Sequence, residues 1–175
     1  MMRRLFLALL LAGPIACAGD ATPTTVRANL DTVVAQGQAT PVDGITSAGQ
    51  PDEAALRVFS ESGYVAVIDM RGPGEDRGFD EASTVAGLGM DYITLPIEKG
   101  DITFDKAREL DAILARYDQP VLLHCGSGNR VGAMLALREF LASGDAGKAL
   151  QKGRDAGLTR LETEVRKVLD DAAGQ

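Results

Sequence analysis

Short apolar stretches alternate with longer amphipathic segments from Ile45 toward the C-terminus, and this alternation restricts the fold more than any other feature. Strands that alternate with helices favour a largely parallel sheet covered by helices on both faces. We therefore expect a single α/β domain with a mostly parallel central sheet. The expected strands are residues 45–48, 65–70, 92–97 and 121–124, and the expected helical segments are 50–62, 80–88, 103–117, 131–141 and 147–172.

Composition limits the size of the core and the kind of partner. The chain has 175 residues, of which 45% are hydrophobic, and this is enough for one domain with a substantial core. The net charge of −7 argues against nucleic acid as a partner. An anionic substrate would therefore be captured by a local group of residues and not by the overall field of the protein.

The first 18 residues resemble a signal peptide. Arg3 and Arg4 precede a short apolar run, and Ala16-Cys17-Ala18 provides a cleavage site of the A-x-A type. The apolar run is too short to span a bilayer as a mature helix, so we expect no membrane span. The alternative is a lipid anchor on Cys17. Both alternatives imply that the protein is exported, and we expect it in the periplasm.

Residues 19–42 read as a linker or tether, and residues 43–175 as the folded domain, although 26–34 has the pattern of one or two helical turns. The chain has two cysteines, and the first is either removed or acylated on export. Cys125 then has no intramolecular disulfide partner. A lone thiol kept in an oxidising compartment is better explained by chemistry than by architecture.

A glycine-rich turn follows the last expected strand, from Cys125 to Arg130, and is called the cysteine turn below. Such a turn directs backbone N–H groups into one concavity at a helix N-terminus, where anions bind and a thiolate is stabilised. Arg130 adds a planar clamp for an oxyanion. An arginine in the first turn opposes the helix dipole, which favours a role with an anion over a plain surface position. The residues expected to hold the anion are Gly126, Ser127, Gly128, Asn129 and Arg130.

Other polar residues complete the expected site. His124 is the only histidine, and it points away from Cys125 because adjacent strand residues face opposite sides. We expect it to hydrogen-bond the backbone of the cysteine turn. A cleavage reaction also needs a proton donor, for which Asp101 is our choice, with Glu98 and Asp105 as alternatives. Arg71 is expected either at the mouth of the site or in a pair with Glu75.

The motif His124-Cys125-x-x-Gly128-x-Arg130 resembles the phosphate-binding loop of the protein tyrosine and dual-specificity phosphatase superfamily. Within it, the chain is most similar to the bacterial phosphatase-like domains of beta-lactamase hydrolase-like proteins and of fused phosphatase–NAD kinase proteins. The resemblance covers about residues 43–145. Three upstream segments carry it as well: 47–51, 67–71 with Glu75, and 89–97.

The resemblance implies a cysteine-dependent hydrolase. Cys125 would attack phosphorus and form a phosphocysteine, while Arg130 and the amides of the cysteine turn hold the phosphoryl oxygens. Asp101 would protonate the leaving oxygen. The substrate would be a phosphorylated small molecule or protein, and neither a metal nor a cofactor is implied.

The length of the cysteine turn leaves two alternatives open. Four residues separate Cys125 from Arg130, where the phosphatase motif has five, and Val131 stands where a serine or threonine is usual. Four residues are typical of rhodanese sulfurtransferases, whose cysteine carries a persulfide. The alternatives to a phosphatase are therefore a sulfurtransferase using a Cys125 persulfide and a non-catalytic anion-binding or redox module.

Overall fold

The computed structural model describes residues 26–39 and 45–174. Within them, five strands form one sheet in the order β1-β2-β5-β3-β4, and all neighbouring strands are parallel. The bounds in sheet order are β1 Val26–Arg27, β2 Ile45–Ala48, β5 Val121–His124, β3 Ala66–Asp69 and β4 Asp91–Thr94. The expected α/β domain with a parallel sheet is confirmed.

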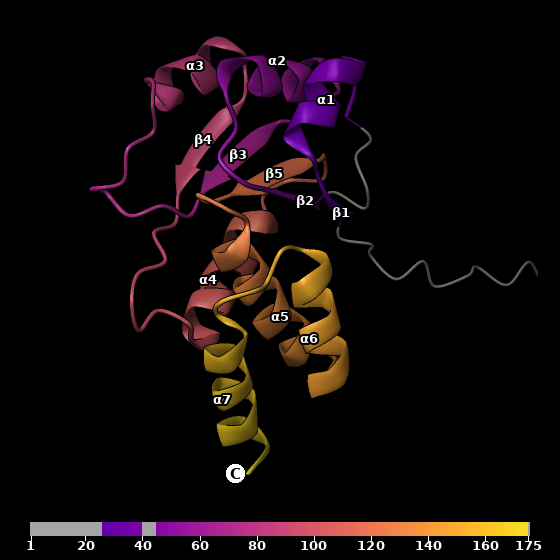
Figure 1. The fold of residues 1–175 in the computed structure, drawn as a ribbon, viewed down its shortest axis with the longest axis vertical. Helices are drawn as coiled ribbons and strands as arrows, with labels where there is room; N and C mark the ends of the chain where they lie inside the picture. The colour runs from indigo at the N-terminus through magenta and orange to yellow at the C-terminus, as the bar shows by residue number, and fades with distance from the viewer. Residues whose placement is uncertain (1–25, 40–44, 175) are drawn as a thin grey trace, which may run out of the picture.

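Helices cover both faces of the sheet (Figure 1). One face carries α1 Leu30–Gln36, α2 Glu53–Glu61 and α3 Glu81–Gly87, and the other carries α4 Phe104–Leu114, α5 Asn129–Ser143, α6 Ala146–Asp155 and α7 Glu162–Ala173. The central strand β5 supplies both cores. Leu122 packs into the apolar cluster beneath the first group of helices, whereas Val121 and Leu123 pack into the cluster beneath the second. This alternation follows from the two-residue period of a strand.

Side-chain caps define where most of the helices begin. The side chain of the N-cap residue accepts a hydrogen bond from a first-turn backbone N–H in α1, α2, α3, α4 and α6. Helix α5 differs, because its N-cap is Gly128, which has no side chain. The first-turn N–H groups of α5 therefore face the cysteine turn without a capping carboxylate or hydroxyl from that position.

Two stretches differ from the expected layout. The expected tether 19–42 contains β1 and α1, and Val26 and Arg27 pair with Thr46 and Ser47 of β2. A two-residue strand is too short to show alternation, so the sequence pattern did not reveal it. The signal peptide and the lipid anchor on Cys17 fall outside the described residues and stay predictions.

The second difference lies near the C-terminus, where one helical region was expected over 147–172. The structure has two helices, α6 and α7, joined by a loop at 156–161. Gly157 has a φ of +106°, which a residue with a side chain adopts only with strain. No helix in the described part of the chain is long and apolar enough to cross a membrane.

Candidate active site

The cysteine turn lies at the carboxyl end of β5 and leads directly into α5. Cys125 is buried at 1% exposure, and its Sγ accepts a hydrogen bond from the Gly128 N–H at 3.1 Å. Gly128 adopts a φ of +82°, which turns the backbone back toward the thiol. N–H groups in the first turn of a helix have no intrahelical acceptor and carry the positive end of its dipole. The turn can therefore stabilise both a thiolate and a bound anion.

Arg130 is held beside the thiol by a carboxylate from a distant loop. Its Nη2 donates to Glu75 Oε2 at 2.7 Å, and its Nη1 donates to Glu75 Oε1. The hydrogen bond from Arg130 lowers the pKa of Glu75 to about 2. The same hydrogen bond raises the pKa of Arg130, against the effect of burial and with a further contribution from Cys125. Both groups are therefore charged at neutral pH.

The geometry of this pair leaves part of the guanidinium available. Glu75 occupies the edge formed by Nη1 and Nη2. A guanidinium has five N–H donors in one plane, so Nε and the remaining Nη hydrogens can bind a second oxyanion. Glu75 also accepts a hydrogen bond from the Gly72 N–H at 2.7 Å, which fixes its carboxylate to its own loop.

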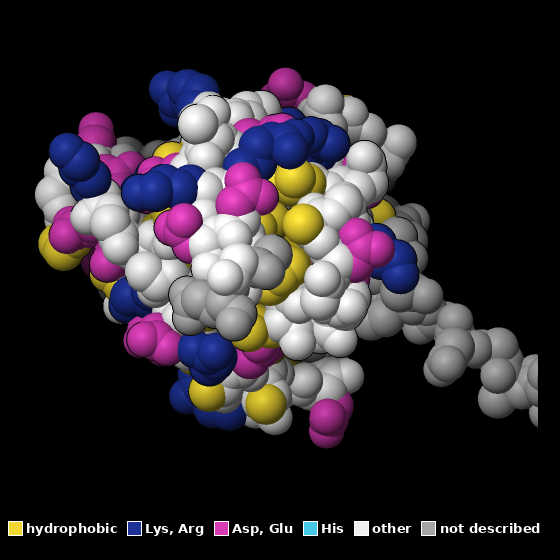
Figure 2. All heavy atoms as spheres, turned by 90° about the horizontal axis from the view of Figure 1, so that it is seen from below, with side chains coloured by type: hydrophobic (Ala, Val, Ile, Leu, Met, Phe, Trp, Pro, Cys, Tyr) yellow, Lys and Arg dark blue, Asp and Glu magenta, His cyan; other side chains and the backbone are white. Residues whose placement is uncertain are grey.

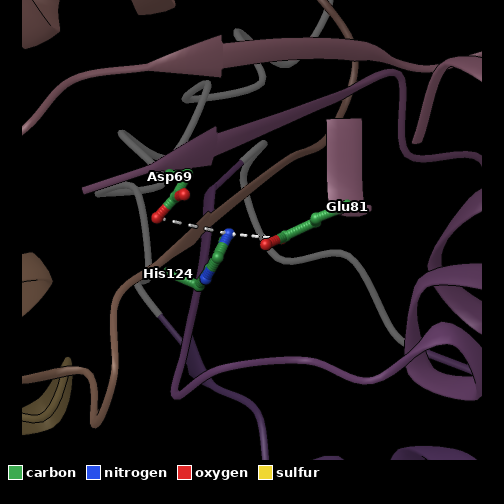
Figure 3. A group of neighbouring side chains, drawn as sticks. All are labelled: Asp69, Glu81 and His124. Atoms are coloured by element: carbon green, nitrogen blue, oxygen red, sulfur yellow. Dashed lines mark ion pairs between the residues drawn. The ribbon is translucent and has the colours of Figure 1, made fainter. Parts of the chain in front are cut away.

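A buried charged cluster lies behind the cysteine turn and consists of Asp69, Arg71, Glu81 and His124, each at most 1% exposed. Nε of Arg71 donates to Asp69 Oδ1 at 2.8 Å, and the Arg71 guanidinium also pairs with Glu81. His124 Nε2 lies 2.8 Å from Glu81 Oε1 and 3.9 Å from Asp69 Oδ1 (Figure 3). The imidazole therefore contacts carboxylates, and the expected contact with the turn's backbone is wrong.

Asp69 is the most highly coordinated residue of this cluster. It also accepts hydrogen bonds from Tyr92 Oη at 2.8 Å and Arg77 Nε at 3.0 Å. Burial alone would raise the pKa of Asp69, but the hydrogen bonds from Arg71 outweigh it and hold the pKa at about 2. Arg71 thus neither lines the mouth of the site nor pairs with Glu75, because it is fully buried between Asp69 and Glu81.

The same cluster has the composition of a metal site. Ligand atoms of Asp69, Glu81 and His124 lie within 4.8 Å of one another. However, the Arg71 guanidinium bridges the two carboxylates, and Arg77 pairs with Asp69 as well. Two arginines already balance the two carboxylates, so this donor set does not fit a divalent cation. Its ion pairs join the ends of β3 and β5 to the start of α3.

A cleft of about 920 Å³ opens over the cysteine turn. Three loops and the start of α7 form its walls. Its charged lining residues are Glu75, Glu98, Lys99, Arg130, Arg160 and Glu164.

The three candidate proton donors lie in different places. Glu98 lines the cleft, and its Oε1 lies 3.1 Å from the position that a Cβ on Gly72 would take. Asp101 is not among the lining residues, and its Oδ2 accepts a hydrogen bond from the Glu98 N–H at 3.0 Å. Asp105 pairs with Arg108 at 2.7 Å on the exposed surface of α4. Of these three candidates, Glu98 alone lines the cleft.

Asn129 and Ser127 connect the cysteine turn to distant parts of the chain. The Asn129 Oδ1 accepts hydrogen bonds from the Thr159 N–H at 2.8 Å and the Leu161 N–H at 3.4 Å. Arg27 of β1 donates to the Ser127 carbonyl oxygen at 2.9 Å. Sequence reasoning found neither contact, because no local pattern links residues 30 to 100 positions apart.

Residues 40–142 match the model of the beta-lactamase hydrolase-like protein, phosphatase-like domain. A beta-lactamase hydrolase-like protein of Agrobacterium fabrum is 33% identical over 101 residues, which are 55% of this chain and 23% of that protein. The matched stretch is thus about a quarter of the curated relative's length.

Solved structures with the same fold are phosphatases. One assigned as a phosphatase from Neisseria meningitidis aligns with a TM-score of 0.63 and 18% identity, over 74% of this chain and 93% of that one. Tk-PTP in its active form aligns with a TM-score of 0.59 and 20% identity, over 73% and 91%. At this level of identity the structures establish the fold, which is that of the cysteine phosphatases.

Proposed function

Because this chain belongs to the phosphatase-like domain family of the beta-lactamase hydrolase-like proteins, we propose that it is a cysteine-dependent phosphatase acting on phosphate monoesters. The observation that carries the proposal is the position of Cys125. Its Sγ lies at the bottom of the cysteine turn, accepts a hydrogen bond from Gly128 and is close to the Arg130 guanidinium. A thiolate in such a place is a nucleophile with an oxyanion clamp beside it.

The reaction proceeds in two displacements. In the first, the Cys125 thiolate attacks phosphorus, an S–P bond forms, the P–O bond to the leaving group breaks, and a carboxylic acid gives its proton to the leaving oxygen. In the second, the same group, now a carboxylate, takes a proton from water as the water attacks phosphorus. The S–P bond then breaks, inorganic phosphate is released, and the thiolate is restored.

Charge on the phosphoryl oxygens is stabilised by the cysteine turn. We assign the binding of these oxygens to the backbone N–H groups from Gly126 to Arg130, and Arg130 offers the guanidinium edge that Glu75 leaves available. Donors that are fixed before the substrate arrives lower the barrier because they need no reorganisation. Ser127, Gly128 and Asn129 contribute through their backbone in this scheme.

The proton donor belongs to the loop that contains Glu98 and Asp101. Asp101 is the choice favoured by the sequence, whereas Glu98 is the one that lines the cleft. We assign the donor role to Glu98 and a supporting role to Asp101, whose carboxylate accepts from the Glu98 N–H and so shapes the loop.

Sulfur transfer is the second candidate function, and the four-residue spacing between Cys125 and Arg130 favours it. A shorter turn encloses a smaller volume and suits a persulfide. In that case Cys125 would accept a sulfane sulfur from thiosulfate and pass it to cyanide, releasing sulfite and then thiocyanate. The third alternative, a non-catalytic module, would bind anions without turnover or be oxidised at the Cys125 thiol.

Mass spectrometry of trapped Cys125 separates these functions. Rapid quenching with an aryl phosphate is expected to give phosphocysteine, and Cys125→Ser should abolish hydrolysis. Arg130→Lys should reduce it strongly, because lysine cannot provide the bidentate clamp. A persulfide after incubation with thiosulfate, without any phosphate turnover, would replace the phosphatase by the sulfurtransferase.

Export to the periplasm remains part of the proposal. It rests on the pattern of residues 1–18, with cleavage after Ala18 or lipidation at Cys17. Expression of the full chain, fractionation and intact-mass measurement would identify the processed form. An unprocessed chain in the cytoplasm would contradict it.

A further inference from the structure

The loop at 156–161 closes one side of the cleft, although it lies outside the residues matched by the family model. Arg160 and Leu161 of this loop line the cleft together with Glu164 of α7. This side of the cleft therefore comes from a part of the chain whose role the family match does not define.

The backbone around Arg160 is anchored to the cysteine turn. Asn129 accepts hydrogen bonds from the N–H groups of Thr159 and Leu161, the residues on either side of Arg160. At the start of the loop, Ser47 Oγ donates to the Ala156 carbonyl oxygen at 2.5 Å. The position of Arg160 is thus fixed relative to the thiol, although its side chain is exposed.

Arg160 and Lys99 are cations that enter the cleft from different loops. Neither forms an ion pair or hydrogen bond with another side chain among residues 26–39 and 45–174. Three carboxylates line the same cleft: Glu75, Glu98 and Glu164. Glu75 is engaged by Arg130, and Glu98 is the proposed proton donor. Glu164 is the lining carboxylate that has neither role, and it stands against two cations.

Apolar residues lie between these charges. Ile97, Ile102 and Leu161 line the cleft and suit an apolar leaving group. Acidic and basic side chains are interspersed over the face that Figure 2 shows, and the chain as a whole carries a charge of −7. An attraction for an anion would therefore act only over the short distance within the cleft.

We propose that Arg160, assisted by Lys99, selects phosphate monoesters whose leaving group carries a second negative charge. This inference rests on the proposed phosphatase activity and adds a substrate class to it. The shared chemistry is an anion tethered to the phosphate ester, which an acidic phosphopeptide and a small doubly anionic ester both provide.

Two matched pairs of substrates test the proposal. The first is a short phosphotyrosine peptide with glutamate next to the phosphotyrosine, compared with glutamine at that position, so that the leaving group is the same. The second is 4-carboxyphenyl phosphate compared with 4-carbamoylphenyl phosphate. At low ionic strength we expect the wild-type kcat/KM to favour the acidic peptide by about three- to fivefold.

Variants test whether Arg160 causes this preference. Arg160→Gln should bring the ratio of kcat/KM for the glutamate peptide to that for the glutamine peptide close to one, and Arg160→Lys should keep part of the preference. Arg57→Gln, an exposed arginine of α2 outside this cleft, is the matched control and should keep all of it. A preference in the peptide pair alone identifies a peptide substrate, and a preference in both pairs identifies the wider class. Equal kcat/KM values for the two members of each pair, or a preference that survives Arg160→Gln, would overturn the proposal.

Binding to the Cys125→Ser variant separates this inference from the proposed activity. If the wild-type chain hydrolyses no ester, the phosphatase proposal fails, yet the peptide affinities still test Arg160. Tighter binding of the glutamate peptide that is lost in Cys125→Ser/Arg160→Gln supports the inference. Equal dissociation constants for the two peptides contradict it.

Discussion

Glu75 and Arg130 lie 55 positions apart in the chain and meet through two parallel hydrogen bonds at the mouth of the cysteine turn. The carboxylate is attached to its own loop by the Gly72 N–H, so it acts as a fixed support for the guanidinium. The pair thereby joins the loop after β3 to the first turn of α5.

Replacing Glu75 by glutamine should weaken this support and lower kcat/KM for an aryl phosphate by about tenfold.

The pKa of Glu75 in the folded protein, about 2, lies below its ordinary value of 4.5. Its stabilising contribution is therefore complete above pH 4.5 and is lost as the pH falls toward 2. The effect of the variant should be constant from pH 5 to 8. Glu61→Gln, an exposed change on α2, is the control, and unchanged kinetics for Glu75→Gln would exclude the supporting role.

The proton donor can be identified from pH profiles of kcat/KM. If Glu98 donates the proton, kcat/KM of the wild-type chain has a limb that falls at high pH, and the Glu98→Gln variant is slower and lacks this limb. Asp101→Asn should keep the shape of the profile. An aryl phosphate with a very good leaving group should reduce the effect of Glu98→Gln, because such a group needs little protonation. Loss of the alkaline limb in Asp101→Asn alone would give the role to Asp101.

Asp69→Asn should destabilise the domain by about 3 kcal/mol, because it removes one of the two carboxylates that balance the buried Arg71 guanidinium. Urea unfolding followed by circular dichroism measures this change. The pKa of Asp69 is held at about 2, below its ordinary 3.8, so its contribution is present above pH 3.8 and disappears as the pH falls toward 2. The difference between wild type and variant should shrink over that range. Asp118→Asn, at an exposed position, should have little effect at any pH.

Gly132→Ala should disturb the packing of α5 against the 156–161 loop. A Cβ at Gly132 would lie 2.3 Å from the Leu158 backbone nitrogen and 2.6 Å from the Gly153 carbonyl oxygen. Neither backbone atom can move alone, so we expect a loss of about 3 kcal/mol in thermal or urea unfolding. Gly87→Ala in α3 has no heavy atom within 4 Å of the new methyl group and should be neutral or stabilising. A neutral Gly132→Ala would show that the contact is looser than described.

The sequence predicted the order of strands and helices from Ile45 onward because that order depends on local periodicity. It did not predict β1, which has only two residues and is defined by its pairing with β2. It also joined α6 and α7 into one region, since the break depends on the contacts of loop 156–161 with Asn129 and Ser47.

The sequence predicted some residues of the candidate site and missed the contacts of others, for the same reason. Cys125 and Arg130 lie on the same short turn, so their spacing in the sequence alone brings them together. The partners of Arg71 and His124 come from two elements, Asp69 from β3 and Glu81 from α3, and only the folded chain shows that Glu81 joins them. The choice between Glu98 and Asp101 depends on how one loop turns, which a pattern of residue types does not determine.

The contacts of Arg27 and of loop 156–161 with the cysteine turn have a practical consequence for the limits of the working unit. A fragment trimmed to residues 40–142, the stretch that defines family membership, would keep the thiol and its arginine. It would lose the Arg27 bond to Ser127 and the Thr159 and Leu161 bonds to Asn129. The folded unit that supports the cysteine turn is thus wider than the domain that sequence similarity outlines, and it extends at both ends to the segments that contact the turn.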